Sequence, residues 1–143
     1  MTISSDLVET GSCFEQQFKP VIVTGEWRVA VLRQCDKVYP HCIQEVERHN
    51  ETDEVFILTM GKADLIIVEE KNGQFIPFVN PMELNVAYNV KRSVWHHAVL
   101  SADAHIFLFE KADTTRENSD YMTLDAGVQE IIREKISVKS DIR

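Results

Sequence analysis

The sequence of 143 residues has few cysteines and no long apolar segment. No apolar run approaches the ~20 residues that a membrane-spanning helix needs, so we expect no association with a membrane. The first residues carry neither a basic segment nor an apolar core, so we expect no signal peptide and a cytoplasmic location. The cysteines Cys13, Cys35 and Cys42 are odd in number and lack metal-ligand spacing. We therefore expect free thiols, with a disulfide between Cys35 and Cys42 as the alternative.

Positive charge is also scarce, because 15 Lys and Arg stand against 23 Asp and Glu, for a net charge of −8. An acidic surface without a basic stripe repels phosphate backbones, so we expect no nucleic-acid partner. Internal repeats and low-complexity segments are absent as well. A hydrophobic content of 44% is ordinary for a folded protein, and this length accommodates one core. The sequence therefore predicts a single domain over residues 1–143.

The chain does contain a series of short strand patterns separated by turn signals. The expected strands cover residues 18–24, 27–32, 55–60, 64–68, 75–79, 84–90, 95–100 and 104–110. Pro77 interrupts one of them, which predicts an edge strand. This series favours an all-β antiparallel sandwich or barrel with its core at about 18–125. Apolar residues at helical spacing predict a C-terminal helix at about 126–137, on the outside of the barrel.

Two short polar runs, Glu47–Glu54 and Ser93–His97, stand at the edges of expected strands. Folding can bring His49, Glu54 and His96 from these runs into one pocket. Imidazoles with a carboxylate are common ligands of a catalytic divalent metal, and they are also common general acids and bases. The alternative is an internal His–Glu hydrogen bond without a function. We predict that His49, Glu54 and His96 are catalytic.

The spacing of the first run resembles the first signature of the cupin family. Four residues separate His49 from Glu54, and six separate Glu54 from Gly61, as in that signature. Glu47 stands where the family has its first histidine. The resemblance implies a metal site formed by Glu47, His49, Glu54 and His96. Such donors suit zinc, manganese, iron or nickel, and a metal-free site is the alternative.

The second run resembles the second cupin signature, which has a proline, a glycine and a histidine. His96 occupies the histidine position, while Lys91 and Ser93 replace the proline and the glycine. The two signatures together imply a cupin-type antiparallel β-barrel, or jelly roll. His97 must point to the side of its strand opposite to His96, where we expect a role in packing or in an interface.

Within that superfamily, residues 45–125 are most similar to the ureidoglycolate lyase family of cupin-like enzymes, through Glu47-Arg48-His49, Arg92 and residues 94–97. The resemblance implies cleavage of ureidoglycolate to glyoxylate and urea. It also implies a homodimer, for which edge strands such as residues 18–32 could pair between subunits. The alternatives are another metal-dependent cupin enzyme, such as an isomerase or dioxygenase, and a small-ligand-binding cupin without catalysis.

A small-molecule carboxylic acid is the expected substrate. Arg48 and Arg92 are candidates to bind its carboxylate, since a guanidinium can donate two hydrogen bonds to a carboxylate at once. Tyr88 is a candidate to donate a phenolic hydrogen bond. The alternatives are solvated loop charges for the arginines and a core position for Tyr88.

Overall fold

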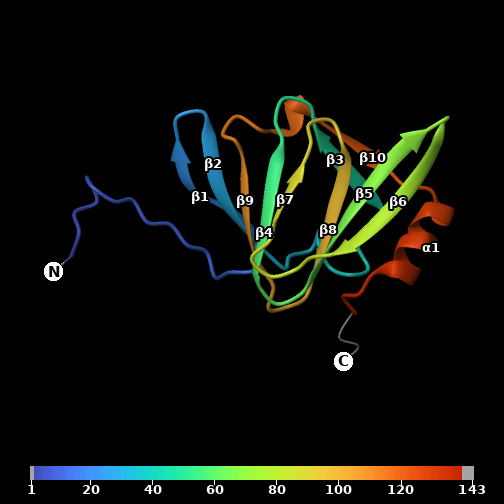
Figure 1. Ribbon diagram of the computed structural model, residues 1–143, viewed down its shortest axis with the longest axis horizontal. Coiled ribbons are helices and arrows are strands. Elements are labelled where there is room, and N and C mark those ends of the chain that lie inside the picture. Colours follow the sequence, from blue (N-terminus) through green and yellow to red (C-terminus); the bar gives the residue numbers. More distant parts are fainter. Residues whose placement is uncertain (1, 140–143) are drawn as a thin grey trace.

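The structure is a computed structural model that describes residues 2–139, and these residues form two antiparallel sheets of five strands each. The elements are β1 (Phe18–Thr24), β2 (Trp27–Arg33), β3 (Glu45–His49), β4 (Glu54–Met60), β5 (Ala63–Lys71), β6 (Gln74–Pro81), β7 (Ala87–Val90), β8 (Trp95–Leu100), β9 (His105–Lys111), a short 3-10 helix η1 (Arg116–Asn118), β10 (Ser119–Thr123) and α1 (Ala126–Lys135). The first sheet has the strand order β1-β2-β9-β4-β7, and the second has the order β10-β3-β8-β5-β6. The sheets face each other, with α1 beside the second sheet (Figure 1). The predicted antiparallel barrel with a C-terminal helix is confirmed.

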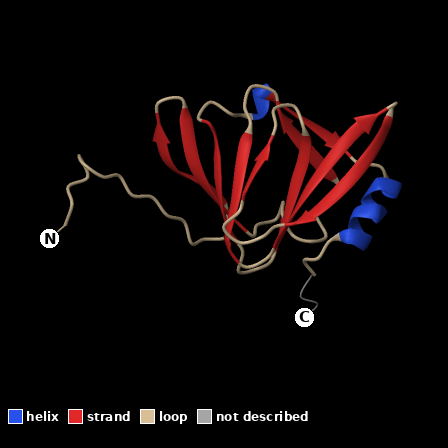
Figure 2. Ribbon diagram, in the orientation of Figure 1, coloured by secondary structure: helices blue, strands red, loops and turns tan. Residues whose placement is uncertain are grey.

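Two apolar clusters hold the elements together. One lies between the sheets and includes Phe56, Leu58 and Ile106. The other lies between the outer face of the second sheet and the helix α1, which runs beside that sheet in Figure 2. Val128 and Ile132 of α1 are buried in this cluster. Burial of these apolar side chains supplies the main favourable free energy of folding. The helix therefore covers the outer face of the second sheet.

Strand boundaries agree with the sequence in part. Pro77 lies on β6, which is an edge strand of the second sheet as predicted. The prediction of a strand over 84–90 was wrong in its first half, since β7 begins only at Ala87. Asn85 has a positive φ of 63°, and its N–H donates to the carbonyl of Leu58, so the chain turns there. Leu84, ahead of this turn, is 53% exposed.

Two strands that the sequence did not indicate, β3 and β10, supply much of the site. Both are short and polar, and they pair with each other so that His49 lies opposite Ser119. On its other side β3 pairs with β8 through Glu47 and His96. A four-residue loop then leads from His49 to Glu54 at the start of β4, in the opposite sheet. This register brings both polar runs to the same end of the barrel.

The structure also answers two questions about composition. Cys13, Cys35 and Cys42 are free thiols in the part of the chain that the structure describes, as predicted, and the alternative disulfide is not formed. The helices of residues 2–139 are all too short or too polar to cross a lipid bilayer.

Candidate functional site

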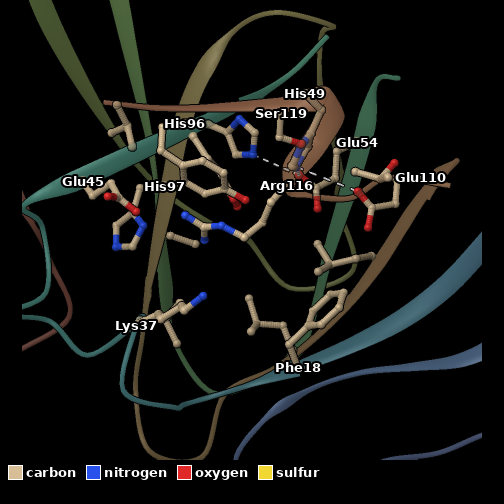
Figure 3. A pocket seen from close by; sticks show the side chains of 18 of the residues that line it. Phe18, Lys37, Glu45, His49, Glu54, His96, His97, Glu110, Arg116 and Ser119 are labelled. Carbon is tan, nitrogen blue, oxygen red and sulfur yellow. Dashed lines mark hydrogen bonds and ion pairs between the residues drawn. The ribbon is translucent and has the colours of Figure 1, made fainter. Parts of the chain in front are cut away.

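A cavity of about 530 Å³ lies between the two sheets and is lined by side chains from both. Figure 3 shows His49, Glu54, His96 and Glu110 grouped on one side of this cavity, with Phe18 and Lys37 on the opposite side. This volume is in the range typical of small-molecule sites. The cavity is therefore the candidate functional site of this chain.

Glu54 lies between the two imidazoles that the sequence predicted to meet it. Its Oε2 is 2.9 Å from Nε2 of His96 and 3.2 Å from Nε2 of His49. All three residues are less than 9% exposed. The structure thus brings the three predicted catalytic residues together, from β3, β4 and β8.

Hydrogen bonds on the far side of each ring fix the direction of the imidazoles. The carbonyl of Val94 lies 2.9 Å from Nδ1 of His96 and can only accept, so this nitrogen carries a proton. Nδ1 of His49 is hydrogen-bonded with the hydroxyl of Ser119 at 2.8 Å. Both Nε2 atoms therefore point at Glu54, which is the arrangement that orients histidines toward a metal or a substrate.

Protonation of the triad follows from these contacts. Burial alone would raise the pKa of Glu54, but the hydrogen bonds and charges of His49 and His96 outweigh it and lower that pKa to about 2. Burial alone would lower the pKa of each histidine, but the hydrogen bond and charge of Glu54 outweigh it and raise both pKa values from the usual value of histidine. Without a metal, the triad is thus a buried carboxylate flanked by imidazoles that readily hold protons.

Glu110 is a fourth buried ionisable group of the site, beside His49, Glu54 and His96, and sequence reasoning missed it. Its Oε1 accepts hydrogen bonds from Nη2 and Nε of Arg28, at 2.6 and 3.1 Å. Its Oε2 lies 3.9 Å from Nε2 of His49 and has no hydrogen-bond partner among residues 2–139. Burial and the charge of Glu54 raise the pKa of Glu110. Alternation along residues 104–110 puts Glu110 on the inner face with Ile106 and Leu108, and this was the signal that could have found it.

The histidines and acids fall into two groups that could hold a metal ion, within the described part of the chain. One consists of Glu47, His49 and His96, and the other of His49, Glu54 and Glu110. In each group the donor atoms lie within 4.8 Å of one another. Glu47 is only half-buried, whereas every member of the second group is buried. Residues that fit a divalent cation are therefore present.

The predicted substrate-binding residues lie elsewhere, since none of the three is among the described residues that line the cavity. Arg48 pairs with Asp120 at 2.8 Å and stacks over the ring of Trp95, on the outer side of β3. Arg92 is exposed. The hydroxyl of Tyr88 accepts a hydrogen bond from the backbone N–H of Glu83.

Other cationic side chains line the cavity instead. Lys37 and Arg116 are exposed at its wall, and Arg28 is held against Glu110. The guanidinium of Arg116 lies 4.0 Å above the ring of Tyr121, which also lines the cavity. Arg116 lies in η1, outside both polar runs, and the sequence carried no signal that singled it out.

His97 was expected to pack on the opposite side of β8 from His96. Its Nε2 donates a hydrogen bond to the carbonyl of Cys42 at 2.6 Å, which is a packing contact. Burial lowers the pKa of His97 to about 4, so the ring is neutral. The residue nevertheless borders the cavity, beyond the point where β3 and β8 are paired.

Comparisons with known proteins show the fold. Neither a protein-family model nor a curated protein matches the chain. Among solved structures it is similar to Streptomyces PAC13 with uridine, with a TM-score of 0.51 and 10% identity over 81% of this chain and 86% of that chain. A further structure of Pac13, described as a unique nucleoside dehydratase and a β-barrel, gives a TM-score of 0.50 and 9% identity over 81% and 87%.

A cupin-2 domain containing protein from Shewanella frigidimarina is also similar, with a TM-score of 0.48 and 20% identity over 68% of this chain and 84% of that chain. Identities this low are informative about the fold alone. The two facing antiparallel sheets, with a His/Glu cluster in the cavity between them, form an antiparallel β-barrel, which is the fold that the likeness to Pac13 shows.

Proposed function

We propose that the protein is a lyase for a small hydroxylated carboxylic acid, with ureidoglycolate as the substrate that the sequence resemblance favours. The observation that carries the proposal is the buried Glu54 between His49 and His96, on the wall of a cavity that also presents cations. A carboxylate and a protonated imidazole in contact provide a base and an acid at one place.

The reaction needs one proton removed and one supplied. Glu54 takes the proton of the substrate hydroxyl, and the oxygen electron pair forms the carbonyl of glyoxylate as the carbon–nitrogen bond breaks. His96 gives its Nε2 proton to the leaving nitrogen, which departs as urea. The proton on Glu54 then returns to His96 along their 2.9 Å hydrogen bond, which restores the starting state. No other reactant is required.

Binding of the substrate carboxylate falls to Arg116 in this proposal, in place of Arg48 and Arg92. Arg116 lines the cavity, and its guanidinium plane is supported by the ring of Tyr121. Lys37 adds a second positive charge at the same wall. A guanidinium restrained by stacking loses less freedom when it forms two parallel hydrogen bonds to a carboxylate.

A divalent metal is compatible with the site, since both histidines are fixed through Nδ1 and present Nε2 to the cavity. Either of two sets could hold it, Glu47 with His49 and His96 or His49 with Glu54 and Glu110, and their nitrogen and oxygen donors suit manganese, iron, zinc or nickel. When bound, such an ion would polarise the substrate hydroxyl and lower its pKa.

The test is release of urea and glyoxylate from ureidoglycolate by the purified protein, assayed without added metal and with each of the four metals. We expect turnover that His96→Asn abolishes. Arg116→Gln should raise KM by about tenfold or more, because one charge-assisted contact is lost. Arg92→Gln is the matched control and should leave KM unchanged. Absence of product under every condition, or equal effects of both arginine variants, would contradict the proposal.

A second candidate is dehydration of a larger hydroxylated substrate, such as a nucleoside. The specific observation is the cavity of about 530 Å³ with Phe18, Phe56 and Tyr121 in its lining, which offers room and aromatic surface beyond the needs of a small acid. The likeness in fold to a nucleoside dehydratase prompts the choice of probe. Stabilisation of the protein against heat by uridine, but not by ureidoglycolate, would favour this candidate.

We also expect a homodimer in the cytoplasm. The expectation of a dimer is supported by apolar surface on the edge hairpin β1–β2, where Val23 is 58% exposed and Trp27 is 49% exposed. Three free thiols suit a reducing compartment. Light scattering of the purified protein measures the mass directly and would show a monomer if the dimer does not form.

A further inference from the structure

The unpartnered Oε2 of Glu110 is the feature of the cavity that the acid–base triad does not use. The Glu110 side chain is only 3% exposed, yet this oxygen has no hydrogen-bond partner among the described residues. Leaving a buried charged oxygen without a partner is costly. Native structures rarely keep such an atom unless a ligand, an ion or a water completes its contacts.

Arg28 holds this oxygen in a fixed direction. Two hydrogen bonds from its guanidinium go to Oε1 of Glu110, and a third, 3.3 Å long, goes to the carbonyl of Thr114. Because Oε1 is restrained in this way, Oε2 is directed toward Nε2 of His49. The contact with Arg28 thus orients the free oxygen rather than satisfying it.

The acids crowd a small volume. Glu54 and Glu110 offer oxygens within 4.8 Å of each other and of His49. Two buried carboxylates at this separation repel unless a positive charge stands between them. With neutral imidazoles, the carboxylates of Glu54 and Glu110 and the guanidinium of Arg28 leave a net charge of −1, so a bound cation would relieve the repulsion.

We propose that Glu110 is a direct metal ligand, and that His49, Glu54 and Glu110 bind one divalent cation while Glu47 stays outside its coordination sphere. The inference rests on the metal-binding part of the proposed function. Donors that share one such ion lie about 3–4 Å apart, since each bond is about 2.1 Å long. Nε2 of His49 already lies 3.2 Å from Glu54 and 3.9 Å from Glu110.

Glu47 is the competing carboxylate, at the position where the first cupin signature has its first histidine. It is half-buried and lies directly opposite Tyr121 in the strand pair β3–β10. Glu110 lies on β9, which neither signature covers. If Glu110 is the ligand, its replacement should weaken metal binding and replacement of Glu47 should not; if Glu47 is the ligand, the reverse is expected. Each residue can be replaced without changing the other.

The experiment is titration of the metal-stripped full chain with Mn²⁺ and separately with Zn²⁺, by calorimetry. The variants are Glu110→Gln, Glu110→Asp and Glu47→Gln, with the exposed Glu134→Gln as the control. We expect Glu110→Gln to weaken binding at least ~10-fold, and Glu47→Gln to change it less than ~3-fold. The electron paramagnetic resonance spectrum of bound Mn²⁺ should change in the Glu110 variants and stay the same in Glu47→Gln.

Glu110→Asp is the control for misfolding of Glu110→Gln. It keeps the negative charge beside Arg28 and moves the carboxylate oxygen away from His49 by the length of one carbon–carbon bond. It should fold and still bind Mn²⁺ more weakly. The inference is overturned if Glu47→Gln is the variant that loses the metal, if Glu110→Asp binds normally, or if the unmodified protein binds neither ion. Failure of the ureidoglycolate assay alone leaves it intact, since metal affinity is measured without substrate.

Discussion

Replacing Glu54 by Gln tests the electrostatics of the triad directly. The substitution keeps the size of the side chain and removes its charge between His49 and His96. A pKa lowered from 4.5 to about 2 corresponds to about 3 kcal/mol of folding stability near neutral pH, from the linkage between protonation and folding. We therefore expect Glu54→Gln to lower the free energy of unfolding by about 3 kcal/mol at pH 5.5, measured by urea denaturation in the presence of a chelator.

The pH dependence gives the sharper test, because the carboxylate and the histidines act in opposite directions. The pKa of Glu54 is lowered on folding, so its contribution is complete above pH 4.5 and is lost as the pH falls toward 2. The pKa values of His49 and His96 are raised, so their contribution is complete below pH 6.5 and is lost as the pH rises through the raised values. The triad thus stabilises the metal-free protein most between pH 4.5 and 6.5.

Above pH 6.5 the free energy of unfolding should fall by up to about 1.4 kcal/mol per pH unit for each histidine. In Glu54→Gln this fall should vanish, since burial then keeps both rings neutral. The control is Glu134→Gln on the exposed side of α1, which should follow the unmodified protein throughout. An unchanged slope above pH 6.5 in Glu54→Gln, or a loss below about 1 kcal/mol at pH 5.5, would refute the ion-pair description of this site.

Two further predictions concern the fold and are read from thermal or urea unfolding. Gly61→Ala should cost about 2–3 kcal/mol or more, because φ is +76° and the added carbon would lie 2.6 Å from backbone atoms of Ala104. Gly73→Ala has a similar φ of +74° but open space around it, so a loss as large as that of Gly61→Ala would contradict the steric reason. Ile132→Ala should cost about 2–5 kcal/mol, since Ile132 is 0% exposed on the face of α1 that packs against the second sheet. Ile131→Ala, at a 41% exposed neighbour, should cost less than about 1 kcal/mol, and equal costs would show that α1 does not pack as described.

Much of the fold was predictable because strand and turn patterns are local. The short strand patterns in residues 95–100 and 104–110 correctly indicated β8 and β9. The spacing of His49 and Glu54 also held, since a short loop joins β3 to β4 across the mouth of the barrel. The polar strands β3 and β10 escaped prediction because their stability comes from pairing with each other, and no apolar alternation marks them.

The sequence by itself determined the class of fold and the central triad, because periodicity and the spacing of a few residues are sufficient for both. Only the tertiary structure decided which charged side chains join them. Glu110 meets Arg28 across 82 residues of chain, and Arg116 lines the cavity while Arg92 does not. The physical reason is that strand pairing and burial place distant residues side by side, and the direction of a loop side chain depends on neighbours that no local pattern records.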